Sequence, residues 1–357
     1  MTTPVPLIEP LVIPGSLHGP GGERFIGFSD LCDAVQRGIW GNDDFCLDPE
    51  RRLEAYRHDD YEERHVFLAR SDGRLVGCAV LDVPLADNLS TCYLDILVHP
   101  GHRRQGVAKV LHATAENHVR RLGRTVIMGW SEMRLPAIPD PEVLVPGSGA
   151  GGYPKHSAAA SFALSEEYDL AQVDRISLLP PSTAGLPAHD TDGADGYGMV
   201  FWENRVPDGL IDRYAVLRRF MSTDAPLGDF VLEEEVWDAE RIRADEERHV
   251  AGGGLSLVCA AVEKGSGALV GHTVLHSSRK APFVAYQEDT LVLRGHRGHR
   301  LGYRMKAPNL RRLRDEWPAV ERLYTWNAAE NSFMLAVNVE LGFRPVGATA
   351  GWQKKLR

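Results

Sequence analysis

The sequence is poor in cysteine and shows none of the cysteine patterns that mark disulfide frameworks or structural zinc sites. The five cysteines are scattered along the chain, and none stands in a C-x-x-C pair: Cys32, Cys46, Cys78, Cys92 and Cys259. An odd number of unclustered cysteines argues against a secreted, disulfide-stapled protein. We therefore expect a protein of the reducing cytoplasm.

Long hydrophobic runs are also absent. The sequence has no uninterrupted apolar stretch of the roughly 18 residues that a membrane-spanning helix needs. Residues 1–20 lack a basic start, and Pro, Gly or Glu interrupts each of their apolar runs, which argues against a signal peptide. We expect no membrane partner.

An excess of positive charge is missing as well. The 40 Lys and Arg residues face 49 Asp and Glu residues, for a formal net charge of -9, which argues against a dedicated nucleic-acid binder. Hydrophobic residues make up 43% of the 357 residues, enough to build packed cores. Because domains usually span about 100 to 200 residues, the length favours two globular domains.

An internal repeat organises the chain. Residues 73–112 align without gaps on residues 267–306, at an offset of 194 positions. Twelve of the forty aligned positions are identical, among them Gly77 with Gly271 and one Gly-His-Arg tripeptide in each copy. An ungapped match of this length indicates a duplicated domain.

Both copies predict the same order of elements: a helix, a hairpin, a strand, a second helix and a further strand. In the first copy these elements are expected over residues 28–39, 66–83, 93–98, 107–122 and 124–130. In the second copy they are expected over residues 208–222, 255–277, 289–293, 301–316 and 322–326. Each half therefore belongs to the α+β class.

The stretch between the copies is rich in Pro, Gly, Ser and Asp and has few large apolar residues, as is typical of a linker. We predict an N-terminal domain over residues 1–180, a linker over residues 181–196 and a C-terminal domain over residues 197–357.

The turn between the strand and the second helix of each copy is the segment that carries chemistry. Residues 102–108 read His-Arg-Arg-Gln-Gly-Val-Ala, and residues 296–302 read His-Arg-Gly-His-Arg-Leu-Gly. A basic, glycine-containing turn that opens into a helix points unpaired backbone N–H groups and the positive end of the helix dipole at one place. A small residue at Ala108 or Gly302 lets a phosphate approach the backbone. Each turn therefore predicts a pyrophosphate cradle.

These turns resemble the phosphate loop of the GNAT superfamily of acyl-CoA-dependent N-acyltransferases, whose pattern is (Q/R)-x-x-G-x-(G/A). Residues 103–108 match this pattern in full. Residues 297–302 match it except at the fourth position, where Arg300 replaces glycine. In both copies the motif lies between a hydrophobic strand and a helix, where the family places it.

The C-terminal copy resembles the family after its last strand too. Asn331 precedes a helix that ends at Gly342-Phe343, similar to the Asn…Leu-Gly-Phe ending common in these enzymes. The equivalent N-terminal helix is expected over residues 156–167; it lacks the asparagine, and Tyr168 stands in place of Phe343. The resemblance covers nearly the whole chain and implies two tandem domains, each a mixed, mostly antiparallel sheet flanked by helices, a layout similar to mycothiol synthase.

The resemblance also implies an acetyl-CoA site in each domain. In the family, the strand before the cradle diverges from its neighbour and leaves a V-shaped slot whose strand backbone binds the pantetheine arm, while the amine enters from the opposite side. The residues that the resemblance assigns to acetyl-CoA are Leu97, Val98, Arg103, Arg104, Gln105, Gly106, Val107, Ala108, Leu291, Val292, Arg297, Gly298, His299, Arg300, Leu301, Gly302, Tyr303 and Asn331.

Direct attack of an amine on the thioester requires a base for the amine proton and favours an acid for the departing thiolate. The candidate bases are carboxylates on the strand ahead of each cradle: Asp95 in the first copy, and Glu288 and Asp289 in the second. Strand alternation predicts that Glu288 and Asp289 point to opposite faces, so that at most one faces the slot. The alternative role of each is that of a structural carboxylate.

The usual acid is missing from both copies. Many family members place a catalytic tyrosine four residues before the glycine of the closing Gly-Phe, but this position holds Asn338 in the second copy and Ala163 in the first. Another group must serve, or the thiolate leaves without an acid.

Fourteen histidines raise the question of a metal. The pairs His99/His102 and His296/His299 are spaced by three, but they lie in turns beside arginines that would repel a cation, so we expect no metal.

We expect an acetyl-CoA-dependent N-acetyltransferase that acts on a primary amine of a small molecule, as a monomer or homodimer. The alternative is a non-catalytic acyl-CoA-binding sensor or scaffold with one or both domains degenerate. Removal of the candidate bases would abolish turnover in the first case alone.

Overall fold

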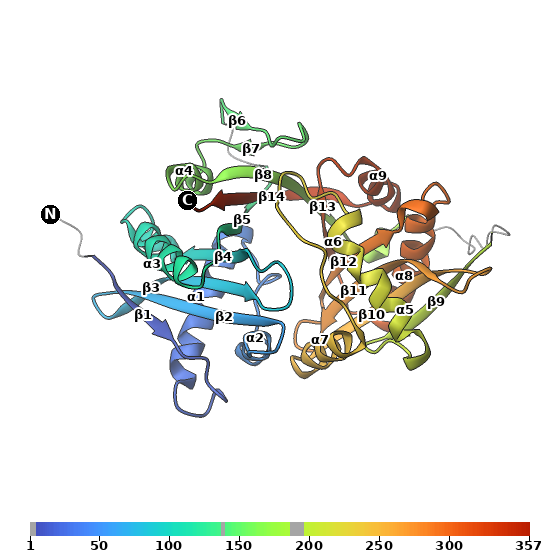
Figure 1. Ribbon diagram of the computed structural model, residues 1–357, viewed down its shortest axis with the longest axis horizontal. Coiled ribbons are helices and arrows are strands. Elements are labelled where there is room, and N and C mark those ends of the chain that lie inside the picture. The colour runs from blue at the N-terminus through green and yellow to red at the C-terminus, as the bar shows by residue number, and fades with distance from the viewer. Residues whose placement is uncertain (1–4, 137–139, 186–195) are drawn as a thin grey trace. The chain divides into compact units, whose positions relative to one another are not determined.

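The computed structural model describes residues 5–136, 140–185 and 196–357, which form two compact units (Figure 1). Unit 1 comprises Met1–Leu144, Tyr153–Ala171 and Thr349–Arg357, and unit 2 comprises Val145–Gly152 and Gln172–Ala348. The division differs from the predicted domains, because the end of the chain belongs to unit 1. Residues 186–195 of the predicted linker lie outside the described residues.

The elements of unit 1 follow the predicted order with additions. They are β1 (Leu7–Leu11), α1 (Gly22–Trp40), α2 (Pro49–Ala55), β2 (Glu62–Ser71), β3 (Arg74–Pro84), β4 (Thr91–Val98), α3 (Val107–Arg121), β5 (Val126–Arg134), β6 (Val143–Leu144), β7 (Tyr153–Pro154), α4 (Ala158–Ser165) and the start of β8 (Asp169–Leu179). The last residues of the chain lie beside β5, where the backbone N–H of Leu356 donates to the carbonyl of Thr125 at 2.7 Å.

Unit 2 repeats this plan. Its elements are the rest of β8, β9 (Tyr197–Glu203), α5 (Ile211–Arg219), α6 (Met221–Asp224), α7 (Ala239–Ala251), β10 (Gly254–Glu263), β11 (Leu269–Ser278), β12 (Val284–Val292), α8 (Leu301–Glu316), β13 (Arg322–Ala328), α9 (Ser332–Leu341) and the start of β14 (Arg344–Lys355).

The sheet of each unit is mixed and mostly antiparallel. Unit 1 has the order β1-β2-β3-β4-β5 and unit 2 the order β9-β10-β11-β12-β13-β8. The parallel pairs among those with a described register are β4–β5 and β12–β13. The duplicated α+β fold expected from the sequence is thus confirmed.

Helices cover both faces of each sheet. In unit 1, α1 packs through Phe25, Phe28 and Leu31 on a face formed by residues such as Val80. Burial on both faces explains why β3 is an almost continuous apolar run rather than an alternating one.

The glycine shared by the two copies explains how closely the helix after the cradle packs on the sheet. A Cβ atom on Gly77 would stand 2.9 Å from Cγ1 of Val107 at the start of α3, and one on Gly271 would stand 3.0 Å from Cε of Met305 on α8. Both positions lie opposite the backbone carbonyl of the next strand, so a side chain would push the helix or the strand away.

The sequence of helix α3 has the spacing of buried residues that is typical of a helix packed on a sheet. Val107, Leu111, Ala115 and Val119 are buried at a spacing of four, which places them on one face against the sheet. Gly123 has a φ of 73°, the left-handed conformation expected of a glycine just past a helix end. In the described part of the chain, no helix is long and apolar enough to cross a membrane.

Candidate functional site

The cradle of each unit is an exposed turn that ends at a helix without a side-chain cap. Gly106 is the N-cap of α3 and Arg300 is the N-cap of α8, and neither helix has a side-chain hydrogen bond to its first amides. By contrast, Ser157 caps α4 and Asp238 caps α7 in the ordinary way. The first amides of α3 and α8 are therefore available to an anion.

Arg300 keeps the cradle conformation although it replaces glycine. In unit 1 the left-handed positions are Arg104, with a φ of 62°, and Gly106, with a φ of 82°. In unit 2 the equivalent positions are Gly298, with a φ of 87°, and Arg300, with a φ of 55°. Each turn thus holds one glycine and one arginine at the same two backbone positions, in opposite order. The departure from the family pattern changes the side chains and preserves the backbone.

The arginines of the two cradles differ in their partners. In unit 2, Asp224 pairs with Arg294 at 3.2 Å, Arg297 donates to the backbone carbonyl of Asp224 at 2.9 Å, and Arg300 pairs with Glu340. The guanidinium of Arg300 also lies 4.9 Å from the centroid of the Tyr303 ring. Carboxylates of unit 2 therefore already neutralise part of the charge of its cradle.

The cradle of unit 1 is free of such carboxylates within the described residues. Arg103 donates to the carbonyl of Val98 at 3.4 Å, and Gln105 donates to the carbonyl of Gly101 at 3.5 Å. Arg103 and Arg104 are both exposed. Their charge is available to a phosphate group.

The strand before each cradle diverges from its parallel neighbour. Register between β4 and β5 runs from Thr91↔Val126 to Tyr93↔Met128, whereas β4 continues to pair with β3 as far as Val98. Register between β12 and β13 likewise ends at Gln287↔Thr325, whereas β12 pairs with β11 as far as Val292.

The backbones of Leu97 and Val98, and of Leu291 and Val292, lie in these diverging stretches. Both units therefore contain the open strand edge that the resemblance implies.

Asp95 lies in the diverging part of β4, opposite Val80 on the face that α1 covers. Its side chain reaches solvent, but desolvation by the surrounding protein, together with the charges of Asp82 and Glu132, raises the pKa of its carboxyl to about 7. The charge of Arg64 acts in the opposite direction. Asp95 is therefore a carboxylate that takes and releases a proton near neutral pH.

A bulge in β12 corrects the expectation for the second pair of carboxylates. Thr290 pairs with Thr273 and Gln287 with Leu275, so Glu288 and Asp289 both stand opposite Val274.

Glu288 lies 3.7 Å from His276, and Asp289 acts electrostatically on His272, two residues of β11 that share one face with Val274. The two carboxylates lie on one face rather than on opposite faces, because the extra residue of the bulge cancels the alternation.

Sequence reasoning missed Glu132 on β5. The indole N–H of Trp40, at the end of α1, donates to the Glu132 carboxylate at 2.9 Å, and burial raises the pKa of Glu132. The two residues are 92 positions apart, and no local pattern connects them. The α1 face around Asp95 thus carries three carboxylates: Asp82, Asp95 and Glu132.

Asn331, which the resemblance assigns to acetyl-CoA, caps a helix: its Oδ1 accepts a hydrogen bond from the backbone N–H of Met334 at 3.3 Å and so starts α9. The positions of the usual catalytic tyrosine lie on α4 and α9 as expected, with Ala163 and Asn338 both buried.

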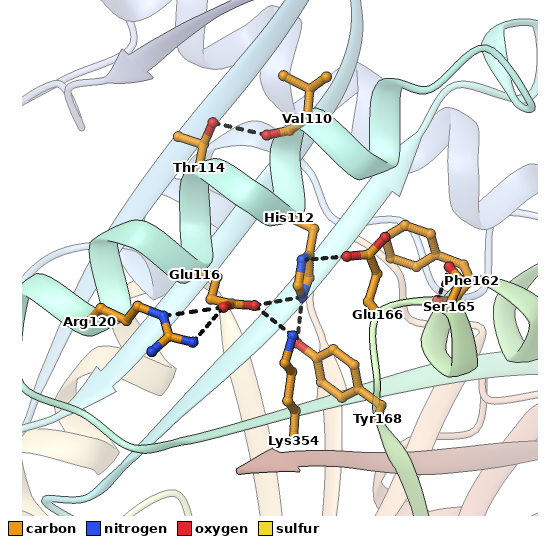
Figure 2. A network of polar contacts seen from close by, with 10 residues as sticks. All are labelled: Val110, His112, Thr114, Glu116, Arg120, Phe162, Ser165, Glu166, Tyr168 and Lys354. Atoms are coloured by element: carbon orange, nitrogen blue, oxygen red, sulfur yellow. Dashed lines mark hydrogen bonds and ion pairs between the residues drawn. The ribbon is translucent and has the colours of Figure 1, made fainter. Parts of the chain in front are cut away.

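A buried polar network of unit 1 also escaped sequence analysis (Figure 2). His112 on α3 lies 3.1 Å from the hydroxyl of Tyr168 and 3.3 Å from the carboxylate of Glu166. One turn further along α3, Glu116 accepts from Lys354 near the end of the chain at 2.7 Å. The network joins the helix behind the cradle to the segment between α4 and β8 and to the last strand.

In the described part of the chain, no group of three His, Cys, Asp or Glu side chains is placed to hold a metal ion.

Residues 37–138 match the acetyltransferase (GNAT) family. No curated protein matches the chain. Among solved structures, a tandem GNAT protein from the clavulanic acid biosynthesis pathway is 26% identical, covers 98% of each chain and has a TM-score of 0.74.

A GCN5-related N-acetyltransferase from Sphaerobacter thermophilus is 14% identical, with 99% of this chain and 96% of that chain covered and a TM-score of 0.62. It shows the fold alone. The N-terminal half of the protein therefore contains a region that matches the GNAT acetyltransferase family, and the chain as a whole shares the tandem GNAT layout of a solved structure.

Proposed function

We propose that the protein is an acetyl-CoA-dependent N-acetyltransferase that acts on a primary amine of a small molecule. The observation that carries this proposal is the same pair of features in each unit: a strand that diverges from its neighbour and leads into a turn before an uncapped helix. The uncapped amides suit a pyrophosphate, and the open strand edge suits the amide groups of a pantetheine arm.

In this proposal the reaction is direct transfer. The nitrogen of the neutral amine attacks the thioester carbonyl, the C–N bond forms, and the C–S bond breaks with its electron pair on sulfur. In unit 1, Asp95 is the base that receives the amine proton, since its carboxyl titrates near neutral pH and lies on the α1 face of the diverging strand. In unit 2, Glu288 and Asp289 hold the equivalent place.

The two units are not equally equipped to bind acetyl-CoA. The exposed Arg103 and Arg104 of unit 1 can pair with phosphates, whereas Arg297 and Arg300 of unit 2 already contact groups of Asp224 and Glu340. We therefore expect both units to bind acetyl-CoA and unit 1 to bind it more tightly. We also propose a cytoplasmic protein that is a monomer or homodimer.

Calorimetric titration with acetyl-CoA tests the proposal. Gly106→Trp and Gly298→Trp each place a bulky side chain at a left-handed position of one cradle. The space beside both glycines is open, and the strain of a side chain at a positive φ is shared by the control variant. Gly73→Trp is the matched control, because Gly73 is also left-handed and open but lies in a hairpin turn.

Two binding sites in the wild type, one lost in each cradle variant and neither lost in the control, are the expected result. Absence of any binding would overturn the acyl-CoA proposal. Binding without transfer of the acetyl group to any member of a panel of primary amines would favour the non-catalytic sensor instead.

A further inference from the structure

Lys306 on α8 is a charged side chain in the core of unit 2. It is 1% exposed, and its Nζ donates to Oδ1 of Asn338 on α9 at 2.8 Å. The Phe343 ring lies 5.8 Å from the same nitrogen. Burial lowers the pKa of Lys306 to about 7, and no neighbouring charge among the described residues contributes to this shift. A buried amine without a carboxylate partner is costly, so a packing role alone does not account for it.

The contacts of Lys306 continue toward the diverging strands. Because a lysine amine bonded to Asn338 fixes Oδ1 as the acceptor, Nδ2 of Asn338 is free to donate, and it lies 2.5 Å from Oδ1 of Asn327 on β13. Asn327 then has its own Nδ2 left as a donor at the end of the chain of three side chains. Each donor in such a chain polarises the next.

Asn327 lies beyond the point where β12 and β13 separate. Their register ends at Gln287↔Thr325, and Asn327 is the second residue after Thr325. Gln287 pairs with Leu275, which packs in one cluster with Leu310 of α8. By alternation Asn327 lies on this α8 face, the face whose helix begins at the cradle, and it is half-buried rather than closed off from solvent.

The equivalent positions of unit 1 do not form this chain. His112 stands where Lys306 stands in the repeat, but it contacts Tyr168 and Glu166. Ala163, which stands at the position equivalent to Asn338, has no side-chain donor or acceptor to continue a chain of hydrogen bonds. The arrangement is therefore specific to unit 2 and is not a requirement of the shared fold.

We propose that Asn327 is a catalytic residue of unit 2 whose amide N–H stabilises the negative charge on the sulfur of the departing thiolate, and that Lys306 and Asn338 are positioning residues that orient and polarise it. This inference rests on the proposed function, since it requires the thioester of acetyl-CoA to lie between β12 and β13. When the C–S bond breaks, the electron pair stays on sulfur, and the thiolate accepts a hydrogen bond from Nδ2 of Asn327. The chain thus takes the place of the missing tyrosine.

Free CoA is the probe for the test, because its thiol ionises in the same slot and needs no knowledge of the acceptor amine. The experiment uses the full chain with Gly106→Trp, which confines binding to unit 2. The apparent pKa of the bound thiol is measured by the ultraviolet absorbance of the thiolate in a pH titration, for Asn327→Asp and Lys306→Met beside the Gly106→Trp parent. Lys264→Met, which removes an exposed lysine in a hairpin turn, is the control.

We expect the bound thiol to be more acidic in the parent and the control than in the two variants, with about a tenfold smaller acid dissociation constant on loss of the donor in Asn327→Asp. Equal thiol acidity in all four proteins, with CoA bound in each, would overturn the inference. Loss of CoA binding by the parent itself would instead count against the proposed function of unit 2, and with it against this inference. If Lys306→Met does not fold, Asn327→Asp decides, since Asn327 is half-buried.

Discussion

At the scale of single residues, the two units differ most in the groups that surround the diverging strands. Burial, helped by the neighbouring carboxylates, makes the charged form of Asp95 unfavourable, and burial alone makes the charged form of Lys306 unfavourable. Such placement lowers stability, and functional sites are where proteins retain it. Neither residue would be kept in its place by packing alone.

Asp95→Asn should reduce turnover and increase stability together. In the Gly298→Trp protein, which confines binding to unit 1, loss of the base is expected to lower kcat by about a hundredfold with little change in the affinity for acetyl-CoA. Release of CoA thiol with the best amine of a panel measures this. In the Gly298→Trp protein that retains Asp95, the rate should rise with pH through about 7 as Asp95 loses its proton, and Asp95→Asn in the same background should lack this rise. Asp72→Asn, in the turn between β2 and β3, is the matched control.

The stability effect has a definite sign. The folded-state pKa of Asp95 is raised from its ordinary value of 3.8 to about 7, so its contribution to stability is complete below pH 3.8 and is lost as the pH rises through 7. Asp95→Asn should therefore raise the thermal midpoint above that of the wild type by more at pH 8 than at pH 5. Asp72→Asn should not show this difference between the two pH values. Equal midpoints for wild type and variant at pH 8 would contradict the environment described for Asp95.

Removal of the buried charge at Lys306 should also stabilise the protein. The folded-state pKa of Lys306 is depressed from 10.5 to about 7, so the unfolded chain binds the extra proton between these values and stability falls as the pH is lowered from 10.5 to 7. Lys306→Met is expected to raise the free energy of unfolding by about 2 kcal/mol at pH 7. Denaturant unfolding measures it, and a less stable variant would mean that the bond to Asn338 outweighs the burial of the amine.

At the scale of elements, the cradle shows that one backbone conformation can be reached by two sequences. Residues 103–108 and 297–302 place glycine and arginine in opposite order at the same left-handed positions. What differs is the charge around them, since Glu340 of α9 pairs with Arg300 and unit 1 has no such pair among its described residues. The affinity of the second cradle is therefore expected to depend on its own acidic neighbours.

Glu340→Gln should tighten binding of acetyl-CoA to unit 2. The change frees Arg300 and removes a negative charge beside the expected phosphates, which we expect to raise the affinity about fivefold at low salt and less at high salt. Calorimetry on the Gly106→Trp protein measures the effect. Glu247→Gln on the exposed face of α7 should leave the affinity unchanged, and the same result for Glu340→Gln would argue that its charge does not reach the site.

The elements that sequence analysis predicted are those whose pattern is local. Strands and helices of the repeat follow from apolar spacing and from the shared glycines. Helix α7 was missed because it is mostly charged and buries one side chain, Ile242. The bulge at Glu288 was missed because the residues around it alternate in the sequence like any strand. The bond between Trp40 and Glu132 joins distant positions, and no local rule predicts it.

At the scale of the whole molecule, neither unit is formed by one continuous stretch of the sequence. Residues 349–357 belong to unit 1, although the rest of unit 1 ends at residue 171. There Trp352 is buried, and its indole N–H donates to Ser131 of β5 at 2.9 Å, while Lys354 pairs with Glu116 of α3. The last strand therefore contributes to the core of the unit whose cradle is better equipped.

Trp352→Ala should destabilise unit 1 by about 3 kcal/mol, since it removes a large buried side chain and leaves a cavity. Hydrogen exchange of β4 and β5 is expected to accelerate, while exchange of β11 and β12 in unit 2 stays as in the wild type. Lys355→Ala, the exposed neighbour two residues before the chain end, is the control. Equal acceleration in both units would show that they unfold as one.

The position of the last strand has a consequence for synthesis. A ribosome makes residue 349 only after 177 further residues have followed residue 171. At ordinary elongation rates this delay is roughly 10 to 40 s. During that interval the sheet of the nascent unit 1 is open beside β5, because the strand that closes it follows unit 2 in the chain. Translation of unit 1 therefore begins before that of unit 2, but the fold of unit 1 is completed after that of unit 2.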